Sequence, residues 1–318
     1  MLGRLLREYP YLVVLVVMGA AFGVVAPTFL DPDNLANILK QSSLLGFVAL
    51  GMCFVLIGGG LDLSVGSIVA LSSVLIAGIS ATQPPIVSIH IALLAGIGIG
   101  FANGFFVTFF NFQPIIVTLS SMAIVRGFGM AYSDSRPIFG TLPSELFLLA
   151  DGTVLGLPVP AILFFAACAI AAIFLRYTAT GRQIYQVGGN EEAARLAGVN
   201  VARVKIITYM ISGFLSAFAG LMLVARMQSG EAVRTGVGWE LDAIAAAAIG
   251  GVSLMGGTGT VLGTLCGTLI IGMMANAFNL MGVNPYWQRI VIGIVLAIAV
   301  ATYSRGGIRR LLHRFRPA

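Results

Sequence analysis

The chain has 318 residues, of which 58% are hydrophobic and only 9% are charged. A soluble globule of this composition lacks the polar groups to cover its surface, so we expect an integral membrane protein surrounded by lipid. The net charge of +6 does not indicate nucleic acid, because the basic residues gather at the chain ends and in one loop, as membrane topology requires.

Ten apolar runs of roughly membrane length follow one another along the chain. They cover residues 10–28, 42–58, 62–81, 86–109, 113–132, 158–176, 204–225, 240–255, 259–281 and 286–303. The first is too long for the core of a signal peptide and reads as an uncleaved helix. The second and eighth are short and end in glycine, as broken helices do. The predicted fold is all-α: a polytopic membrane helix bundle with about ten transmembrane helices, some of them broken, in one domain over residues 1–318.

The charges between the runs predict the orientation. An even number of spans places both termini on one side, together with Arg4, Arg7, Arg176, Arg182, Arg195, Arg203, Lys205, Arg305, Arg309, Arg310, Arg314 and Arg316. The other side receives only Lys40, Arg136, Arg226, Arg234 and Arg289. Since positive residues are retained inside, both termini are expected to be cytoplasmic.

Residues 58–67 place a carboxylate among glycines between two apolar runs, and two interpretations remain open. Asp62 can cap the following helix by accepting a hydrogen bond from the N–H of Ser64 or Val65. Alternatively, the break borders a transport pathway or a moving joint, because irregular backbone inside a membrane is tolerated only when buried in protein or lining a wet cavity. The pathway or gate candidates in this stretch are Gly60, Asp62, Ser64 and Gly66. The charge bias puts the break toward the cytoplasmic end, which favours a joint near the inner gate.

Polar side chains inside the runs are further pathway candidates. They are Asn103, Thr118, Ser121, Asn276 and Asn279. Each can instead bond a neighbouring helix, as is common in membrane bundles. Arg126 follows Pro114 by twelve residues, about 18 Å into its helix. It either snorkels outward, pairs with an acid such as Asp134, or has a role in the pathway.

Two connecting loops are long. Residues 133–157 fall outside, are acidic, and are long enough to form a docking surface. Residues 177–203 fall inside and contain a predicted helix that Asn190 begins and Gly198 ends, with Glu191 and Glu192 in its first turn, followed by Ala193. A helix so short is marginal in water unless something packs on it. It therefore either lies on the membrane face or is held by a cytoplasmic partner.

The eighth run begins with Glu240 and Asp242, which are expected at the outer face and most simply cap that helix. After it, residues 250–258 share two leading glycines, a leucine and a later glycine with residues 59–67. Paired glycine-interrupted segments in two halves of a transporter point to its pathway. Chance or a shared packing need explains so short a match equally well.

Several kinds of chemistry are excluded. Cys53, Cys168 and Cys266 lie in apolar runs without paired spacing, which indicates packing and not metal binding or disulfides. His90 lies at the start of an apolar run and His313 lies in the basic tail, so the two do not indicate a histidine-based metal or catalytic site. No set of catalytic residues comes together in the sequence, so no enzyme is predicted. A P-loop needs a lysine directly after glycine, but Lys40 follows Leu39 and Lys205 follows Val204.

Several separate motifs resemble one family. Glu192-Ala193-Ala194 followed by Gly198 is similar to the EAA loop of ABC importer permeases. Residues 59–67, 180–191, 240–251 and 279–286 resemble the ribose/xylose/arabinose branch of these sugar permeases, in the right order from about residue 35 onward.

The resemblance implies a permease subunit that passes a monosaccharide across the bacterial inner membrane by alternating access. It implies no cofactor in this chain, with ATP and Mg bound by a separate cytoplasmic ATPase that contacts Asn190, Glu191, Glu192, Ala193 and Gly198. A sugar-binding protein on the outer face and a second permease copy, identical or related, complete the implied assembly. The alternative is an ion-coupled secondary sugar transporter in which Asp62 binds the coupling cation.

Overall fold

The computed structural model describes residues 10–139, 142 and 146–303. Its helices are α2 (Pro10–Val25), α3 (Pro32–Ile57), α4 (Val65–Ser80), α5 (Pro85–Phe109), α6 (Pro114–Tyr132), α7 (Phe147–Asp151), α8 (Val159–Tyr177), α9 (Ala179–Gly189), α10 (Glu191–Leu196), α11 (Val201–Met227), α12 (Trp239–Ile249), α13 (Val261–Leu280) and α14 (Pro285–Tyr303). Four two-residue strands form two antiparallel pairs: β1 (Ile138–Phe139) with β4 (Ser229–Gly230), and β2 (Thr153–Val154) with β3 (Leu157–Pro158).

Each of the ten predicted runs overlaps one helix. Among the described residues, six helices are long and apolar enough to cross a membrane, namely α3, α5, α6, α8, α11 and α13, and α2 and α4 are shorter apolar helices. The structure thus supports an all-α, multi-pass membrane protein, while the number of crossings stays a prediction. Of the residues used to predict orientation, Arg4, Arg7, Arg305, Arg309, Arg310, Arg314 and Arg316 lie outside the described residues.

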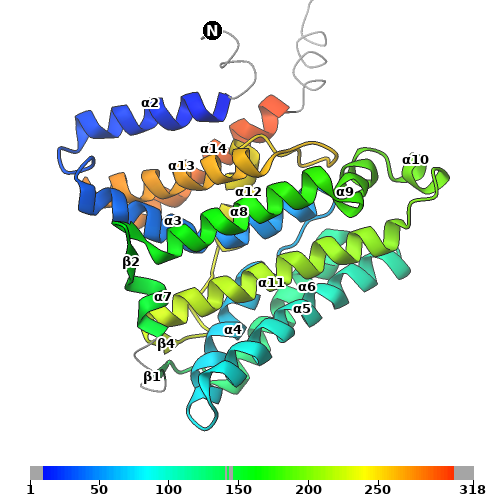
Figure 1. Ribbon diagram of the computed structural model, residues 1–318, viewed down its shortest axis with the longest axis horizontal. Helices are drawn as coiled ribbons and strands as arrows, with labels where there is room; N and C mark the ends of the chain where they lie inside the picture. The colour runs from blue at the N-terminus through cyan, green and yellow to red at the C-terminus, as the bar shows by residue number, and fades with distance from the viewer. Residues whose placement is uncertain (1–9, 140–141, 143–145, 304–318) are drawn as a thin grey trace, which may run out of the picture.

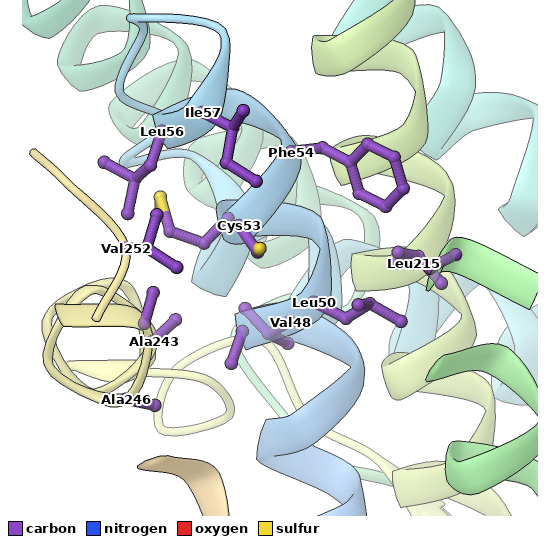
Figure 2. Close-up of a cluster of buried hydrophobic side chains, with 14 of the residues drawn as sticks. Val48, Leu50, Cys53, Phe54, Leu56, Ile57, Leu215, Ala243, Ala246 and Val252 are labelled. Atoms are coloured by element: carbon purple, nitrogen blue, oxygen red, sulfur yellow. The ribbon is translucent and has the colours of Figure 1, made fainter. Parts of the chain in front are cut away.

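Helix α3 is the centre of the largest hydrophobic core. It packs against α11 on one side and α12 and α13 on another. Figure 2 shows Val48, Leu50 and Cys53 of α3 between Leu215 of α11 and the alanines of α12. The prediction that this second span is short was wrong. The helix has 26 residues and begins at Pro32, because its first turns carry polar residues that an apolar run leaves out.

Small residues let α5 and α11 approach closely. Gly96, Gly100 and Gly104 are spaced by four on α5 and face α11. A Cβ on Gly104 would lie 2.7 Å from Cα of Ile206, and one on Gly100 would lie 2.8 Å from the carbonyl carbon of Tyr209. These glycines therefore serve close helix packing, which small residues permit in membrane bundles. The three cysteines are buried and free, which agrees with a packing role.

The molecule has two distinct ends (Figure 1). Helices α9 and α10 lie at one, called the α10 end, and β1, β4 and α7 lie at the opposite one, called the β1–β4 end. Pairing of β1 with β4 ties the long segment after α6 to the chain that follows α11. Lys40 near the start of α3 bonds Asp151 at 2.6 Å and fastens α7 to the same end. Glu145 and Pro143 of this loop lie outside the described residues.

Candidate transport pathway and coupling surface

Two irregular segments enter the helix bundle and meet. The glycine break (residues 58–64) follows α3 and leads into α4, and the re-entrant segment (residues 231–238) follows β4 and leads into α12. Gly236 packs directly on Gly66 in the first turn of α4, since a Cβ added to Gly236 would lie 3.1 Å from Cα of Gly66. The first turns of α4 and α12 therefore lie together inside the molecule. Helices that begin inside a bundle, with their positive N-terminal ends facing inward, are typical of transporter pathways.

Asp62 is fully buried, with 0% of its surface exposed, and is held by three hydrogen bonds. Its Oδ1 accepts from the N–H of Ser64 at 3.0 Å and from Oγ of Ser64 at 2.6 Å, and its Oδ2 accepts from Oγ of Ser212 on α11 at 2.8 Å. Asn103 on α5 donates from Nδ2 to Oγ of Ser64 at 2.9 Å. The predicted bond from the Ser64 N–H is present, and α4 begins at Val65. Asp62 joins the glycine break to two long helices and does not line either large cavity described below.

Gly60 allows Tyr209 to close over the same break. A Cβ on Gly60 would lie 2.8 Å from Oη of Tyr209, and that hydroxyl donates to the carbonyl of Leu61 at 3.2 Å. Any side chain at position 60 would displace the tyrosine. Position 60 thus requires glycine because Tyr209 approaches its Cα closely, and not because the backbone there has a positive φ.

Arg126 holds the re-entrant segment against α6. Its Nη1 donates to the carbonyl of Ala232 at 2.8 Å and to that of Thr235 at 2.5 Å. Among the described residues, Asp134 forms no ion pair with Arg126 and instead lies in the turn after α6 with a φ of 50°. The guanidinium therefore neither snorkels nor pairs with Asp134, but satisfies backbone acceptors that the irregular segment would otherwise leave open inside the bundle.

Glu240 and Asp242 do not cap α12, although the sequence led us to expect that they would. Gly238 occupies the N-cap of α12, and no side chain makes a capping hydrogen bond there. Oε2 of Glu240 lies against the start of α4, 2.8 Å from where a Cβ on Gly66 would be. The sequence could not indicate this, because the re-entrant segment carries α12 into the bundle before the helix begins.

Helices α3 and α12 end in a similar way, at the glycine pairs Gly58-Gly59 and Gly250-Gly251, which is one residue out of register with the sequence match of residues 59–67 to 250–258. At the end of α3, Gly60 N bonds the carbonyl of Val55, and at the end of α12, Val252 N bonds the carbonyl of Ala247, both at 2.9 Å. The second glycine of each pair has a left-handed φ, 77° at Gly59 and 88° at Gly251. A glycine with a left-handed φ just after the last helical turn is a common way for a helix to end. The two helix ends therefore share a local geometry, while the pathway reading of the sequence match stays a prediction.

These two helix ends lie side by side. Gly257 N donates to the carbonyl of Ile57 at 2.9 Å, which joins the glycine turn (residues 250–260) to the glycine break. Tyr185 on α9 donates from Oη to the carbonyl of Gly259 at 3.0 Å. Burial raises the pKa of Tyr185, so its hydroxyl stays a donor at neutral pH. Helix α9, the turn and the break thus form one connected structure at the α10 end.

Helix α10 matches the predicted short helix closely. Oδ1 of Asn190 accepts from Ala193 N at 2.9 Å, and Gly198 follows with a φ of 82°. Glu191 pairs with Arg195 at 3.0 Å and with Lys205 at the start of α11 at 2.5 Å. Glu192 and Ala193 remain exposed. The helix is therefore fixed to α11 through Glu191 and presents its other face outward.

Several predicted pathway residues form hydrogen bonds, either to a neighbouring helix or within the helix that carries them. Asn276 exchanges hydrogen bonds with Asn34 on α3, at 3.0 and 2.8 Å. Asn279 accepts from Gln288 on α14 at 2.9 Å. Thr118 donates to the carbonyl of Pro114 within α6 at 2.9 Å. The two asparagines share a face as predicted, yet they fasten α13 to two different helices.

Two of the cavities formed by the described residues open along the helices of the bundle. A groove of about 640 Å³ lies between α5 and α6 and has Asn103 and Ser121 in a wall that is otherwise mostly apolar, including Phe106 and Phe128. A smaller cavity of about 390 Å³ lies between α3, α12, α13 and α14. Its wall holds a tryptophan, two glutamines, a serine, a carboxylate and a guanidinium: Trp239, Gln41, Gln288, Ser42, Asp242 and Arg289. Of these two, the second offers the mixture of polar and aromatic groups that suits a hydroxyl-rich solute.

Comparison with known proteins finds a matching family and several similar transport proteins. Residues 34–300 match the family described as branched-chain amino acid transport system / permease component. The chain is 41% identical over 314 residues to the ribose import permease protein RbsC of Haemophilus influenzae, covering 98% of this chain and 97% of that protein. It is 43% identical over 279 residues to RbsC of Bacillus subtilis, covering 87% and 86%. It is 40% identical over 306 residues to the L-arabinose transport system permease protein AraH of Escherichia coli K12, covering 94% and 90%. No solved structure gives a significant match.

Proposed function

This chain belongs to the branched-chain amino acid transport system permease family, in the branch of the ribose and arabinose import permeases, and from that premise we propose that it is the membrane subunit of an ABC importer for a monosaccharide. It carries the sugar across the bacterial inner membrane by alternating access. A separate cytoplasmic ATPase binds ATP and Mg and supplies the energy.

The observation that carries this proposal is the form of α10. A six-residue helix capped by Asn190 projects at one end of the bundle, and Leu196 at its tip is 86% exposed. An isolated helix of this length is marginal in water, and an apolar tip in water is unfavourable. A cleft in an ATPase subunit that receives α10 would stabilise both features. The two ion pairs of Glu191 would then transmit force from the helix into α11.

The orientation follows from the same assignment. The α10 end faces the cytoplasm, where the ATPase docks, and the positive residues of the connecting loops gather there. We infer from the charge distribution that both chain termini face the cytoplasm as well. The β1–β4 end faces outward and receives a sugar-binding protein. Each chain presents one α10, so two ATPase subunits require a second permease copy beside this one.

The ion-coupled alternative has less support. Both carboxylate oxygens of Asp62 already accept hydrogen bonds, from Ser64 and from Ser212, in a site with no exposed surface. A coupling cation would have to displace these donors. Asp62 is better suited to hold the glycine break in place.

Co-purification of the tagged permease with a co-expressed candidate ATPase subunit tests the proposal. We expect tagged permease to retain the ATPase, and Leu196→Ser to lower the retained amount at least fivefold. Leu155→Ser is the matched control, because Leu155 is 99% exposed but lies next to β2, away from α10. Equal retention of the ATPase by both variants and the unchanged protein would contradict the assignment of α10.

A further inference from the structure

The cavity between α3, α12, α13 and α14 has amide and charged side chains in its wall. Gln41 follows the first residue of α3 by nine positions, about 14 Å along the helix, and Arg289 follows the start of α14 by four, about 6 Å. Charged and amide side chains are costly where they face lipid. The cavity therefore faces water or protein.

The polar groups of this wall have unused hydrogen-bonding capacity. Oγ of Ser42 is buried, with the residue 2% exposed, and has no partner among the described residues. Across the same described part of the chain, the side chains of Asp242 and Arg289 make no hydrogen bond and no salt bridge. Gln41 donates to Asn37 at 3.0 Å and keeps its carbonyl oxygen available. Asp62 and Nη1 of Arg126, in contrast, make hydrogen bonds to other parts of the protein.

The wall matches the chemistry of a neutral monosaccharide. A sugar hydroxyl both donates and accepts, so it is served by a carboxylate that accepts, a guanidinium that donates and a serine that does both. The indole of Trp239 offers a flat apolar face to the C–H side of a sugar ring. The volume of about 390 Å³ falls in the range of small-molecule sites, roughly 300–1,000 Å³.

Helix α12 connects this wall to the α10 end. Trp239 and Asp242 stand in its first turn, and its last residue, Ile249, leads into the glycine turn that bonds α9 and the end of α3. The helix has only 11 residues, about 16 Å. On the other side, the re-entrant segment that precedes it is held by Arg126. A displacement of α9 and α10 can therefore reach the cavity through one short helix.

We propose that this cavity is a transit site for the monosaccharide, in which Trp239 packs on the sugar ring while Asp242, Arg289 and Ser42 bond its hydroxyls. The assignment rests on the proposed function, because it requires that the chain transports a sugar. It places the site in the half of the bundle nearer to the β1–β4 end. The apolar groove between α5 and α6 is not the sugar route.

The test uses the assembled importer in lipid vesicles with ATP and labelled ribose, arabinose, xylose and galactose. Trp239→Leu and Asp242→Asn should each lower uptake of the sugar that the unchanged complex transports at least tenfold. Trp287→Leu is the matched control, since Trp287 is exposed on α14 and does not line the cavity, and its uptake should stay within twofold. Uptake within twofold of normal by both cavity variants overturns the site. Failure of the unchanged complex to take up any of these sugars overturns the proposed function instead.

A second measurement does not depend on the cavity variants folding well. Gln41 is exposed in the wall, and the three native cysteines are buried, so Gln41→Cys provides a single accessible thiol. A neutral methanethiosulfonate reagent should label it at least threefold more slowly in saturating transported sugar than in an equal concentration of a disaccharide that is not transported. Equal labelling rates in the two solutions would overturn the transit site.

Discussion

Replacement of Asp62 by alanine would remove the acceptor that organises the glycine break. Three hydrogen bonds are lost, two from Ser64 and one from Ser212. At about 1 kcal/mol each, their net contribution is about 3 kcal/mol. The two hydroxyls can turn toward nearby carbonyls, but the N–H of Ser64 at the start of α4 has no such freedom. The start of α4 should therefore loosen, and with it the contact between α4 and the re-entrant segment.

The matched variant is Asp62→Asn, which keeps the shape of the side chain. Its oxygen still accepts from Ser64 and its amide donates to the Ser212 hydroxyl, so the loss should be no more than about 1 kcal/mol. The assay is the temperature at which half of the purified protein aggregates, together with sugar uptake at equal membrane abundance. Asp62→Ala should melt several degrees lower than Asp62→Asn and take up sugar poorly. A normal melting temperature and normal uptake for Asp62→Ala would refute the structural role.

Three further substitutions have defined outcomes. Gly100→Val should lower the aggregation temperature, since overpacking against the backbone of α11 costs about 1–3 kcal/mol, while Gly98→Val, whose Cβ meets nothing within 4 Å, should change it little. Arg126→Met should abolish most uptake and make the re-entrant segment more sensitive to added protease, and normal uptake would remove this residue from the pathway. Asn190→Ala should cost α10 about 1 kcal/mol, seen as faster hydrogen exchange at the amide of Ala193, and unchanged exchange would mean that the cap is dispensable.

Much of the fold followed from the sequence because lipid imposes a simple rule on it. Every backbone group in a membrane must be bonded internally, so apolar runs of sufficient length become helices. Each predicted run overlaps a helix, and the short eighth run corresponds to the 11-residue α12. The start of α3 was missed, since the polar residues of its first turns satisfy the helix geometry without adding hydrophobicity.

The candidate site was predictable only where a local rule applied. Asn190 and Gly198 are recognised as helix ends from residue type alone, and the Ser64 bond to Asp62 spans only two residues. The partners of Arg126 are more than a hundred residues away, so no local pattern indicates them. Trp239 was likewise missed, although an aromatic residue directly before two acids at a glycine-flanked helix start was a usable signal.

The central claim is that this chain passes a monosaccharide on energy supplied by a partner ATPase. The most direct measurement is uptake of labelled monosaccharide by vesicles that contain the complete complex and its sugar-binding protein, with ATP supplied to the ATPase side and with an ionophore that dissipates ion gradients. The account predicts uptake that requires ATP and continues in the ionophore. Uptake that persists without ATP and stops when the gradients are removed would contradict it.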